Sequence, residues 1–253
     1  MVLDQFKLDG KTALVTGASA GLGAAIAVAL AEAGADVVCH GNTRRASETC
    51  KKVEHLGRRA AAVQADLASP QGAIEVFEQA QQFAPIDIVI NNAGTIRRAP
   101  AVEYSDEDWT TVLQVNLNSL FKLSQLAARS FMTRKHPGKI VNIASLLAFQ
   151  GGITVAAYAA SKGAVAQLTK ALANEWAAHG INVNAIAPGY MRIDNTKALQ
   201  QNETRNRQIL ERIPAGRWGE PQDLAGAAVF LASAASNYMH GHILVVDGGW
   251  MGR

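Results

Sequence analysis

The sequence has 253 residues, of which 49% are hydrophobic and 18% charged, and its formal net charge is +3. This balance is typical of a folded chain and excludes an intrinsically disordered one. No apolar run reaches the ~20 residues of a membrane-spanning helix, and the first residues lack the pattern of a signal peptide. We therefore expect one cytoplasmic domain over residues 1–253, without a membrane partner.

Basic and metal-binding residue types form no cluster along the chain. The lysines and arginines are scattered and do not alternate with aromatic residues, so no nucleic-acid partner is expected. Cys39 and Cys50 have no metal or redox motif around them and are interpreted as reduced packing residues. His240 and His242 lack carboxylate or cysteine neighbours. No metal site is therefore predicted.

Short β-branched runs alternate with segments of helix length. The strand-like runs lie at 12–16, 36–40, 60–64, 86–91, 139–144, 181–187 and 242–247. The helix-length segments lie at 22–33, 45–56, 70–83, 106–134, 155–178 and 221–232. Such alternation predicts a parallel sheet with right-handed crossovers and helices on both faces. The predicted fold class is α/β, a doubly wound Rossmann fold with a seven-stranded parallel sheet.

One connection is long for such a domain. Residues 190–213 form a polar stretch between a predicted strand and the next predicted helix. Connections of this length inside a compact domain usually carry function, often as a lid over a bound substrate. We expect a substrate lid at about 190–213.

A glycine-rich turn, T-G-A-S-A-G-L-G, follows the first predicted strand and opens a helix. Glycine permits positive φ and lets a phosphate approach backbone N–H groups at a helix N-terminus. This context is the one that dinucleotide binding requires. The predicted cofactor-binding residues of the turn are Gly17, Ser19, Ala20, Gly21, Leu22 and Gly23.

Two further stretches end strands at the same edge of the predicted sheet. Asn92, Ala93 and Gly94 of the N-N-A-G motif follow the fourth strand, and their small side chains and amides can face a cofactor. Asp66-Leu67 ends the third strand, where the carboxylate can accept a hydrogen bond from an adenine amino group. An ordinary loop role explains each of these stretches equally well when it is taken alone.

Ser145, Tyr158 and Lys162 form a candidate catalytic group. Tyr158 and Lys162 are four residues apart in an Ala-rich helical run, so they share one helix face. Ser145 follows a buried strand, at the end where open α/β sheets bind ligands. A neighbouring ammonium lowers the pKa of a phenol from about 10, which predicts Tyr158 as a general acid/base. A half-buried tyrosine beside a solvated lysine is the structural alternative.

Together these motifs resemble the classical short-chain dehydrogenase/reductase family. T-G-x-x-x-G-x-G, N-N-A-G, a later asparagine, a serine, Y-x-x-x-K and P-G occur in that order. The resemblance implies a nicotinamide dinucleotide cofactor and usually a homotetramer. It implies a catalytic tetrad of Asn116, Ser145, Tyr158 and Lys162, and further cofactor contacts from Tyr158, Lys162, Pro188 and Gly189.

The same resemblance implies a mechanism. Hydride passes between the substrate carbon and the nicotinamide, while Tyr158 gives or takes the proton of the substrate oxygen. Ser145 hydrogen-bonds that oxygen, and Lys162 lowers the tyrosine pKa and holds the nicotinamide ribose. Asn116 holds a water in a proton relay.

The end of the second strand bears on the choice between NAD and NADP. An acidic residue there would bind the ribose 2′-hydroxyl, whereas basic residues favour the 2′-phosphate. The stretch from 40 to 45 reads H-G-N-T-R-R and has no acid. Arg44 or Arg45 can pair with a 2′-phosphate, and both can equally be solvated. We expect NAD or NADP, with Asn42 among the contacts.

Several stretches are similar to the deoxy-sugar-acid dehydrogenases of this family, which interconvert keto and hydroxyl forms of compounds such as 2-dehydro-3-deoxy-D-gluconate. They lie at 95–98, 149–153, 174–177, 187–191, 212–219 and 247–250. The resemblance implies a small-molecule sugar-acid substrate. Arg192 and Asp194 depart from the residues usual in that group.

A sugar acid needs a cation for its carboxylate, and arginine makes the stronger contacts. Either Arg97 or Arg98, close behind N-N-A-G, can take this role. The predicted substrate-binding residues are Arg97, Gln150 and the lid residue Arg192, together with Ser145 and Tyr158. Trp218 and Trp250 are interpreted as packing or interface residues that can also wall the site.

Three alternatives stay open on the sequence. The chain can be a reductase of another carbonyl, such as a 3-oxoacyl thioester or a different hexonate, because the family motifs leave the substrate pocket free. It can also be a dinucleotide-binding sensor without turnover, although the complete tetrad argues against this. A purely structural oligomer is the least favoured, since it would not need the glycine-rich turn.

Overall fold

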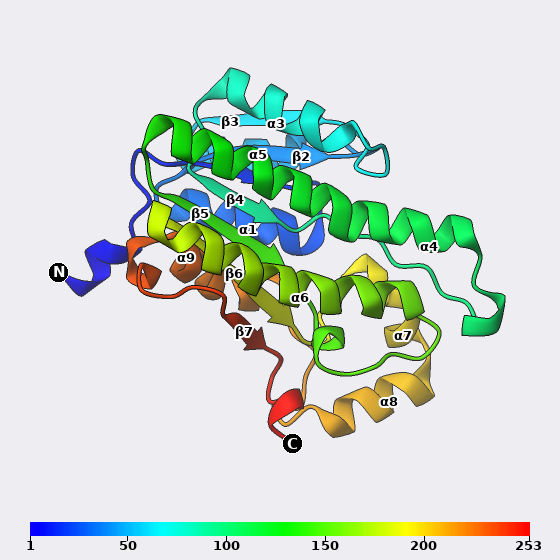
Figure 1. Ribbon diagram of the computed structural model, residues 1–253. Helices are drawn as coiled ribbons and strands as arrows, with labels where there is room; N and C mark the ends of the chain where they lie inside the picture. The colour runs from blue at the N-terminus through cyan, green and yellow to red at the C-terminus, as the bar shows by residue number, and fades with distance from the viewer.

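Residues 1–253 are described by a computed structural model (Figure 1). The seven strands form one parallel sheet in the order β3-β2-β1-β4-β5-β6-β7. They are β1 (Thr12–Val15), β2 (Asp36–Gly41), β3 (Ala60–Gln64), β4 (Ile88–Asn91), β5 (Gly138–Ile143), β6 (Ile181–Pro188) and β7 (Ile243–Val246). The strand order reverses between β1 and β4, which is where doubly wound sheets bind ligands. The predicted fold class is confirmed.

Helices cover both faces of the sheet, and each face has its own apolar cluster. On one face lie α1 (Gly21–Glu32), α2 (Ser47–His55) and α9 (Ala225–Ala232). On the other lie α3 (Gly72–Phe83), α5 (Ser119–Arg134) and α6 (Ala156–Trp176), of which α5 and α6 cross the front of the sheet in Figure 1. No helix combines the length and the apolar composition that crossing a lipid bilayer requires.

The central strands are mostly apolar because both of their faces are covered. Leu14 of β1 pairs with Val38 of β2 and Val89 of β4, and all three belong to the cluster under α3 and α5. Ala13 and Val15, the neighbours of Leu14, belong to the cluster under α1 and α9. Successive side chains of a strand point to opposite faces, so one apolar run supplies both cores.

The helix expected at 106–134 is interrupted. α4 (Asp106–Leu113) begins at Ser105, whose hydroxyl accepts a hydrogen bond from Asp108 N at 3.1 Å. A π-helical turn (Gln114–Asn118) then separates α4 from α5. Such turns are rare and occur frequently at functional sites. Here the turn holds the fully buried Asn116.

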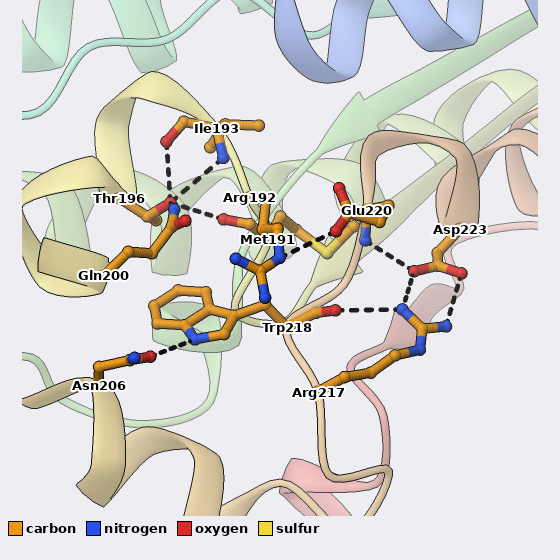
Figure 2. A network of polar contacts seen from close by, with 10 residues as sticks. All are labelled: Met191, Arg192, Ile193, Thr196, Gln200, Asn206, Arg217, Trp218, Glu220 and Asp223. Atoms are coloured by element: carbon orange, nitrogen blue, oxygen red, sulfur yellow. Dashed lines mark hydrogen bonds and ion pairs between the residues drawn. The ribbon is translucent and has the colours of Figure 1, made fainter.

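The long connection at 190–213 contains helices. It contains α7 (Lys197–Gln201) and α8 (Glu203–Arg212), which lie beyond the carboxyl ends of the strands in Figure 1. It packs on a separate apolar cluster of Leu146, Ile209, Ile213, Trp218 and Trp250. At its base the Trp218 indole N–H donates to Asn206 Oδ1 at 2.7 Å, as Figure 2 shows.

Short single turns of helix complete the chain. The 3₁₀ turns are Val2–Phe6, Ala101–Glu103, Leu146–Ala148, Ala177–His179, Asp194–Thr196, Pro221–Leu224, Ala234–Ser236 and Trp250–Gly252. Two of them bear on the site, because Leu146–Ala148 directly follows Ser145 and Asp194–Thr196 precedes α7.

Candidate active site

A cavity of about 220 Å³ lies where the sheet order reverses. It is lined by Gly17, Ala20, Gly21, Leu22, Gly23, Asn92, Ala93, Gly94, Ile143, Tyr158, Lys162, Ile193, Asp194 and Asn195. The glycine turn, the N-N-A-G motif and the Tyr-Lys pair therefore meet in one place. A second cavity of about 260 Å³, at the β3 edge beside Arg45 and Gln64, contains no predicted catalytic residue.

The glycine turn has the features that a phosphate group needs. Gly17 has a φ of +64°, and a Cβ on Gly23 would lie 2.3 Å from the Gly17 carbonyl oxygen. Helix α1 follows Ala20, which provides no side-chain cap. The first N–H groups of the helix are therefore free to bind an anion. These residues fit a dinucleotide.

The N-N-A-G motif joins β4 to β1. Asn92 Nδ2 donates to Thr16 O at 2.8 Å, and Thr16 Oγ1 accepts from the backbone N–H groups of Asn92 and Ala93 at 3.0 and 2.9 Å. A Cβ on Gly94 would lie 3.4 Å from Asn116 Oδ1 and 3.8 Å from Lys162 Nζ. The small side chains of the motif leave room at this wall of the cavity, and the Asn92 amide that lines it is held in place by the backbone of Thr16.

Six predicted cofactor contacts lie outside the cavity. Asn42 Nδ2 donates to Asp66 Oδ1 at 3.0 Å, so these two residues are partners of each other. Leu67 is buried, and its carbonyl accepts from Ser119 Oγ at 2.7 Å. The others, Ser19, Pro188 and Gly189, also do not line the cavity. Asn42 and Asp66 sit beyond β2 and β3, on the side of β1 away from Tyr158.

Helix α6 holds Tyr158 and Lys162 on one face, as their spacing predicts. Lys162 Nζ donates to the carbonyl of Ile143 at 2.6 Å and lies 5.6 Å from the centre of the Tyr158 ring. Ser145 begins the 3₁₀ turn after β5, where its Oγ accepts from Leu147 N at 3.2 Å. Strand β5 thus positions both the serine and the acceptor of the lysine.

The pKa of the tyrosine differs from the expectation. Burial raises the pKa of Tyr158, while the neighbouring Ser145 hydroxyl and the positive charge of Arg98 act in the opposite direction. Burial also lowers the pKa of Lys162 to about 8. Desolvation therefore outweighs any effect of the ammonium on the phenol. At neutral pH Tyr158 is a protonated phenol, the form that gives a proton to a ketone oxygen.

Asn116 is fully buried, and its amide joins three elements. Oδ1 accepts from Thr95 N at 2.8 Å, and Nδ2 donates to Thr95 O at 3.0 Å and to Ser161 Oγ at 3.1 Å. Both amide hydrogens are thereby used. The side chain fixes the loop after β4 against α6, and it has no N–H left to offer a relay water.

The two adjacent arginines have different surroundings. Arg97 Nε lies 3.2 Å from Asp108 Oδ1 on α4. Arg98 donates to the Asn195 carbonyl at 3.3 Å, and its charge acts on Tyr158. The charge of Arg98 therefore reaches Tyr158, whereas Arg97 is paired with a carboxylate.

Two other predicted substrate contacts already have partners. Arg192 Nε lies 2.9 Å from Glu220 Oε1, and both side chains are half exposed (Figure 2). Gln150 Oε1 accepts from the Trp250 indole N–H at 3.2 Å. Neither residue lines the cavity.

The sequence analysis did not identify four lining residues, Ile143, Ile193, Asp194 and Asn195. The Ile193 side chain would lie 3.4 Å from a Cβ on Gly21, so the segment at 190–213 lies directly against the glycine turn. The position of 193–195 shortly after the P-G at the end of β6 was the available signal, because this places the segment at the ligand-binding edge.

Known proteins match the chain along almost all of its length. A family model described as enoyl-(acyl carrier protein) reductase matches residues 17–251. A 2-dehydro-3-deoxy-D-gluconate 5-dehydrogenase from Bacillus subtilis is 57% identical, with 99% of this chain and 98% of that protein covered. The enzyme of the same name from Dickeya dadantii is 52% identical over 100% of both chains.

Solved structures of related dehydrogenases have the same fold as this chain. A protein from Agrobacterium tumefaciens, described as a candidate 2-deoxy-D-gluconate 3-dehydrogenase with bound NADP, is 56% identical with a TM-score of 0.94 and covers 98% of this chain and 99% of its own. A gluconate 5-dehydrogenase from Burkholderia cenocepacia in complex with NADP and tartrate is 39% identical with a TM-score of 0.92 and full coverage of both chains.

The parallel sheet, the glycine turn and the Tyr-Lys pair on α6 agree with these matches. The protein is an oxidoreductase that uses a nicotinamide dinucleotide. It belongs to the short-chain dehydrogenase/reductase family.

Proposed function

We propose that the protein interconverts a ketone and a secondary alcohol on a deoxy sugar acid, with 2-dehydro-3-deoxy-D-gluconate as the alcohol. The observation that carries this proposal is the similarity to four 2-dehydro-3-deoxy-D-gluconate 5-dehydrogenases, which are 51–57% identical over nearly the whole chain. Gluconate 5-dehydrogenases and 5-keto-D-gluconate 5-reductases follow at 41–42%. Relatives at 51–57% identity and relatives at 41–42% identity are thus both named for sugar-acid substrates.

Tyr158 and Ser145 perform the proton chemistry in this proposal. The bound nicotinamide supplies or accepts the hydride. In reduction Ser145 donates a hydrogen bond to the ketone oxygen, and Tyr158 gives that oxygen a proton as the C=O group becomes CH–OH. Oxidation reverses each transfer. Because burial raises the pKa of Tyr158, the phenol carries its proton at neutral pH and is ready for the reductive direction.

Lys162 and Asn116 support the tyrosine. The Lys162 ammonium lies within reach of both the cavity and the phenol ring, so it stabilises the negative charge that forms on Tyr158 and holds the nicotinamide ribose. Asn116 acts through its three hydrogen bonds, which fix Thr95 and α6 on two sides of the cavity. The relay water of the sequence analysis would have to bind elsewhere than at the Asn116 amide hydrogens.

Arg98 is the cation that we assign to the substrate carboxylate. It neighbours Tyr158 electrostatically, and it contacts the lid segment through the carbonyl of Asn195. A carbonyl is a weaker partner for a guanidinium than a carboxylate, so the substrate can replace it. Arg97 and Arg192 are instead neutralised by Asp108 and Glu220.

NADP is the cofactor that we propose, rather than NAD. Four solved relatives contain NADP. The turn after β2 has no acidic residue that would repel a 2′-phosphate, and both of its arginines are exposed. Arg45 Nε donates to Gln64 Oε1 at 3.0 Å, which leaves Arg44 as the better candidate for the phosphate.

The proposal also includes one domain over 1–253 with a lid at about 190–213, a homotetramer and a cytoplasmic location. The tetramer is supported by apolar side chains on the surface. Trp109 on α4, Phe121 on α5 and Val245 on β7 are 40%, 39% and 36% exposed. Such residues on a soluble enzyme are typical of contacts between subunits.

The test is a set of initial rates with NADH and NADPH against 2,5-diketo and 5-keto deoxyhexonates, with an acetoacetyl thioester as control. We expect turnover of the deoxyhexonates, faster with NADPH. Tyr158→Phe should lower kcat by at least about 10³ because the proton donor is lost, while the Kd of NADPH changes little. Activity confined to the thioester would overturn the substrate class, and wild-type turnover in Tyr158→Phe would overturn the mechanism.

A further inference from the structure

His40 connects three adjacent strand ends beside the glycine turn. It lies near the end of β2 and is 2% exposed. Its Nδ1 is 3.3 Å from the backbone nitrogen of Gly17, which follows β1. Its Nε2 is 3.0 Å from the carbonyl oxygen of Ala65, which follows β3. Both ring nitrogens are therefore engaged by the backbone.

These two partners define the tautomer of the imidazole. The Gly17 N–H can only donate, so Nδ1 must carry a lone pair, and the Ala65 carbonyl can only accept, so Nε2 must carry the hydrogen. Only the neutral Nε2–H form satisfies both. An imidazolium would direct an N–H at the N–H of Gly17 and lose that bond.

The backbone of the same residue holds the turn as well. Ala18 N donates to His40 O at 2.7 Å, and Ala18 O accepts from Thr49 Oγ1 on α2 at 2.7 Å. Gly17 also lines the central cavity and has the positive φ of +64°. Because His40 occupies the Gly17 N–H, the donors left for a phosphate are those at the start of α1. The imidazole thus fixes the backbone of the turn that leads to these N–H groups.

We propose that His40 is a positioning residue of the cofactor site: its neutral Nε2–H tautomer fixes the glycine turn, and its protonation releases the turn and weakens dinucleotide binding. The role acts through Gly17, since the buried imidazole has no free nitrogen for the cofactor. It rests on the dinucleotide cofactor and is independent of the identity of the sugar acid.

The surroundings of His40 shift its pKa in both directions. Burial lowers the pKa of His40, whereas the Ala65 carbonyl and the Asp66 carboxylate beyond β3 raise it. Arg44 and Arg45 after β2 and Glu48 on α2 are exposed to solvent. Neutral His40 is thus favoured at neutral pH, and acid below the ordinary range of histidine protonates it.

Two isosteric variants separate the two nitrogens. In His40→Asn the amide oxygen takes the place of Nδ1, so it can still accept from Gly17 but does not titrate. In His40→Gln the amide nitrogen takes the place of Nε2, so it can still donate to Ala65 but leaves Gly17 without an acceptor. Both variants lose one hydrogen bond and keep a side chain of similar polarity.

The measurement is the Kd of NADP⁺ and NADPH by calorimetry between about pH 4 and about pH 8, a range that extends below the ordinary titration range of histidine because burial lowers the pKa of His40. At neutral pH we expect His40→Asn within about threefold of wild type and His40→Gln about tenfold weaker, the effect of one hydrogen bond. In acid the wild-type Kd should rise more steeply than that of His40→Asn. The 2′-phosphate also titrates near pH 6, but equally for both proteins.

The opposite results overturn the proposal. These are His40→Gln binding as tightly as His40→Asn, or the same acid dependence in wild type and His40→Asn. Thermal unfolding of each variant checks that the fold is kept. If both variants fail to fold, ¹⁵N-histidine spectra of the wild type decide, because an Nδ1–H tautomer would exclude the bond from Gly17. A wild type that binds NADPH but reduces no deoxyhexonate would refute the proposed substrate and leave this test intact.

Discussion

Lys162 is a buried cation in the wall of the cavity, and it carries a stability penalty. Burial lowers its pKa from 10.5 to about 8, so at pH 7 the ammonium destabilises the folded state by about 3 kcal/mol. Stability should rise as the pH increases from about 8 to 10.5, because over that range the folded state has lost a proton that the unfolded state still binds.

Lys162→Met should therefore raise the free energy of unfolding at pH 7 by about 2 kcal/mol, after about 1 kcal/mol is subtracted for the lost hydrogen bond to Ile143. It should also abolish turnover. Denaturant unfolding at pH 7 and pH 10 measures the change, and the advantage of the variant should shrink at the higher pH. A variant that is less stable than wild type at pH 7 would show that the ammonium stabilises the fold.

Variants of Arg98 and Arg97 test which arginine binds the substrate carboxylate, with Arg97→Ala as the control for Arg98→Ala. Arg98→Ala should raise KM for the deoxyhexonate about 10- to 100-fold, because a charge-assisted contact is lost, with a much smaller change in the KM for NADPH. Arg97→Ala should change either KM less than about threefold, since Arg97 pairs with Asp108 at an exposed site. Steady-state kinetics of both variants decide, and a larger effect from Arg97→Ala would reverse the assignment.

The glycine turn requires the glycine at position 23, whereas helix α6 does not require the glycine at position 163. A Cβ on Gly23 would lie 2.3 Å from Gly17 O and 2.4 Å from Asn92 Nδ2, whereas nothing lies within 4 Å of a Cβ on Gly163. Gly23→Ala should destabilise the fold by about 1–3 kcal/mol and abolish NADPH binding. Gly163→Ala should stabilise α6 by about 0.5–1 kcal/mol.

Thermal unfolding and NADPH titration of both glycine variants provide the measurement. Tight NADPH binding by Gly23→Ala would mean that the turn can move away from β4 without losing its function. A destabilised Gly163→Ala would mean that the apparently open side of α6 is covered in the assembled enzyme.

The segment at 190–213 and the π-helical turn show details that the sequence pattern did not contain. The polar sequence at 190–213 predicted a long connection, and its helix α8 buries Ile209 against Trp218, nine residues later, and Trp250 near the end of the chain. The run at 106–134 reads as one helix, and the π-helical turn within it is stabilised by bonds from Asn116 to Thr95 and Ser161. Trp250, Thr95 and Ser161 are all distant in sequence from the segments that they contact.

At the scale of the whole molecule, the exposed apolar residues of α4 and α5 predict an assembly contact. The double variant Trp109→Glu and Phe121→Glu should convert the proposed tetramer into a smaller species, because symmetric copies would bring like charges together in an apolar contact. Leu56→Glu, at a residue that is 42% exposed just after α2, is the control and should leave the assembly unchanged. Sedimentation velocity measures the change, and an unchanged sedimentation coefficient in the double variant would place the interface elsewhere.

The sequence by itself determined the order of elements, the parallel sheet and the position of Tyr158 and Lys162 on one helix face. These are local properties: strands buried on both faces need continuous apolar runs, a phosphate turn needs glycine, and a spacing of four places two side chains on one helix face. The family motifs combine such local requirements in a fixed order. The sequence alone therefore suffices to predict the fold class and the family.

Only the tertiary structure decided which polar groups face the cavity and in what state. The charge of Arg98 acts on Tyr158 while Arg97 pairs with Asp108, although the two arginines are adjacent in the chain. Burial sets the pKa of Tyr158, and His40 becomes a fixed neutral imidazole because Gly17 and Ala65 converge on it from two other strands. The physical reason is that hydrogen-bond partners and desolvation depend on residues that folding brings together, and a linear pattern does not contain them.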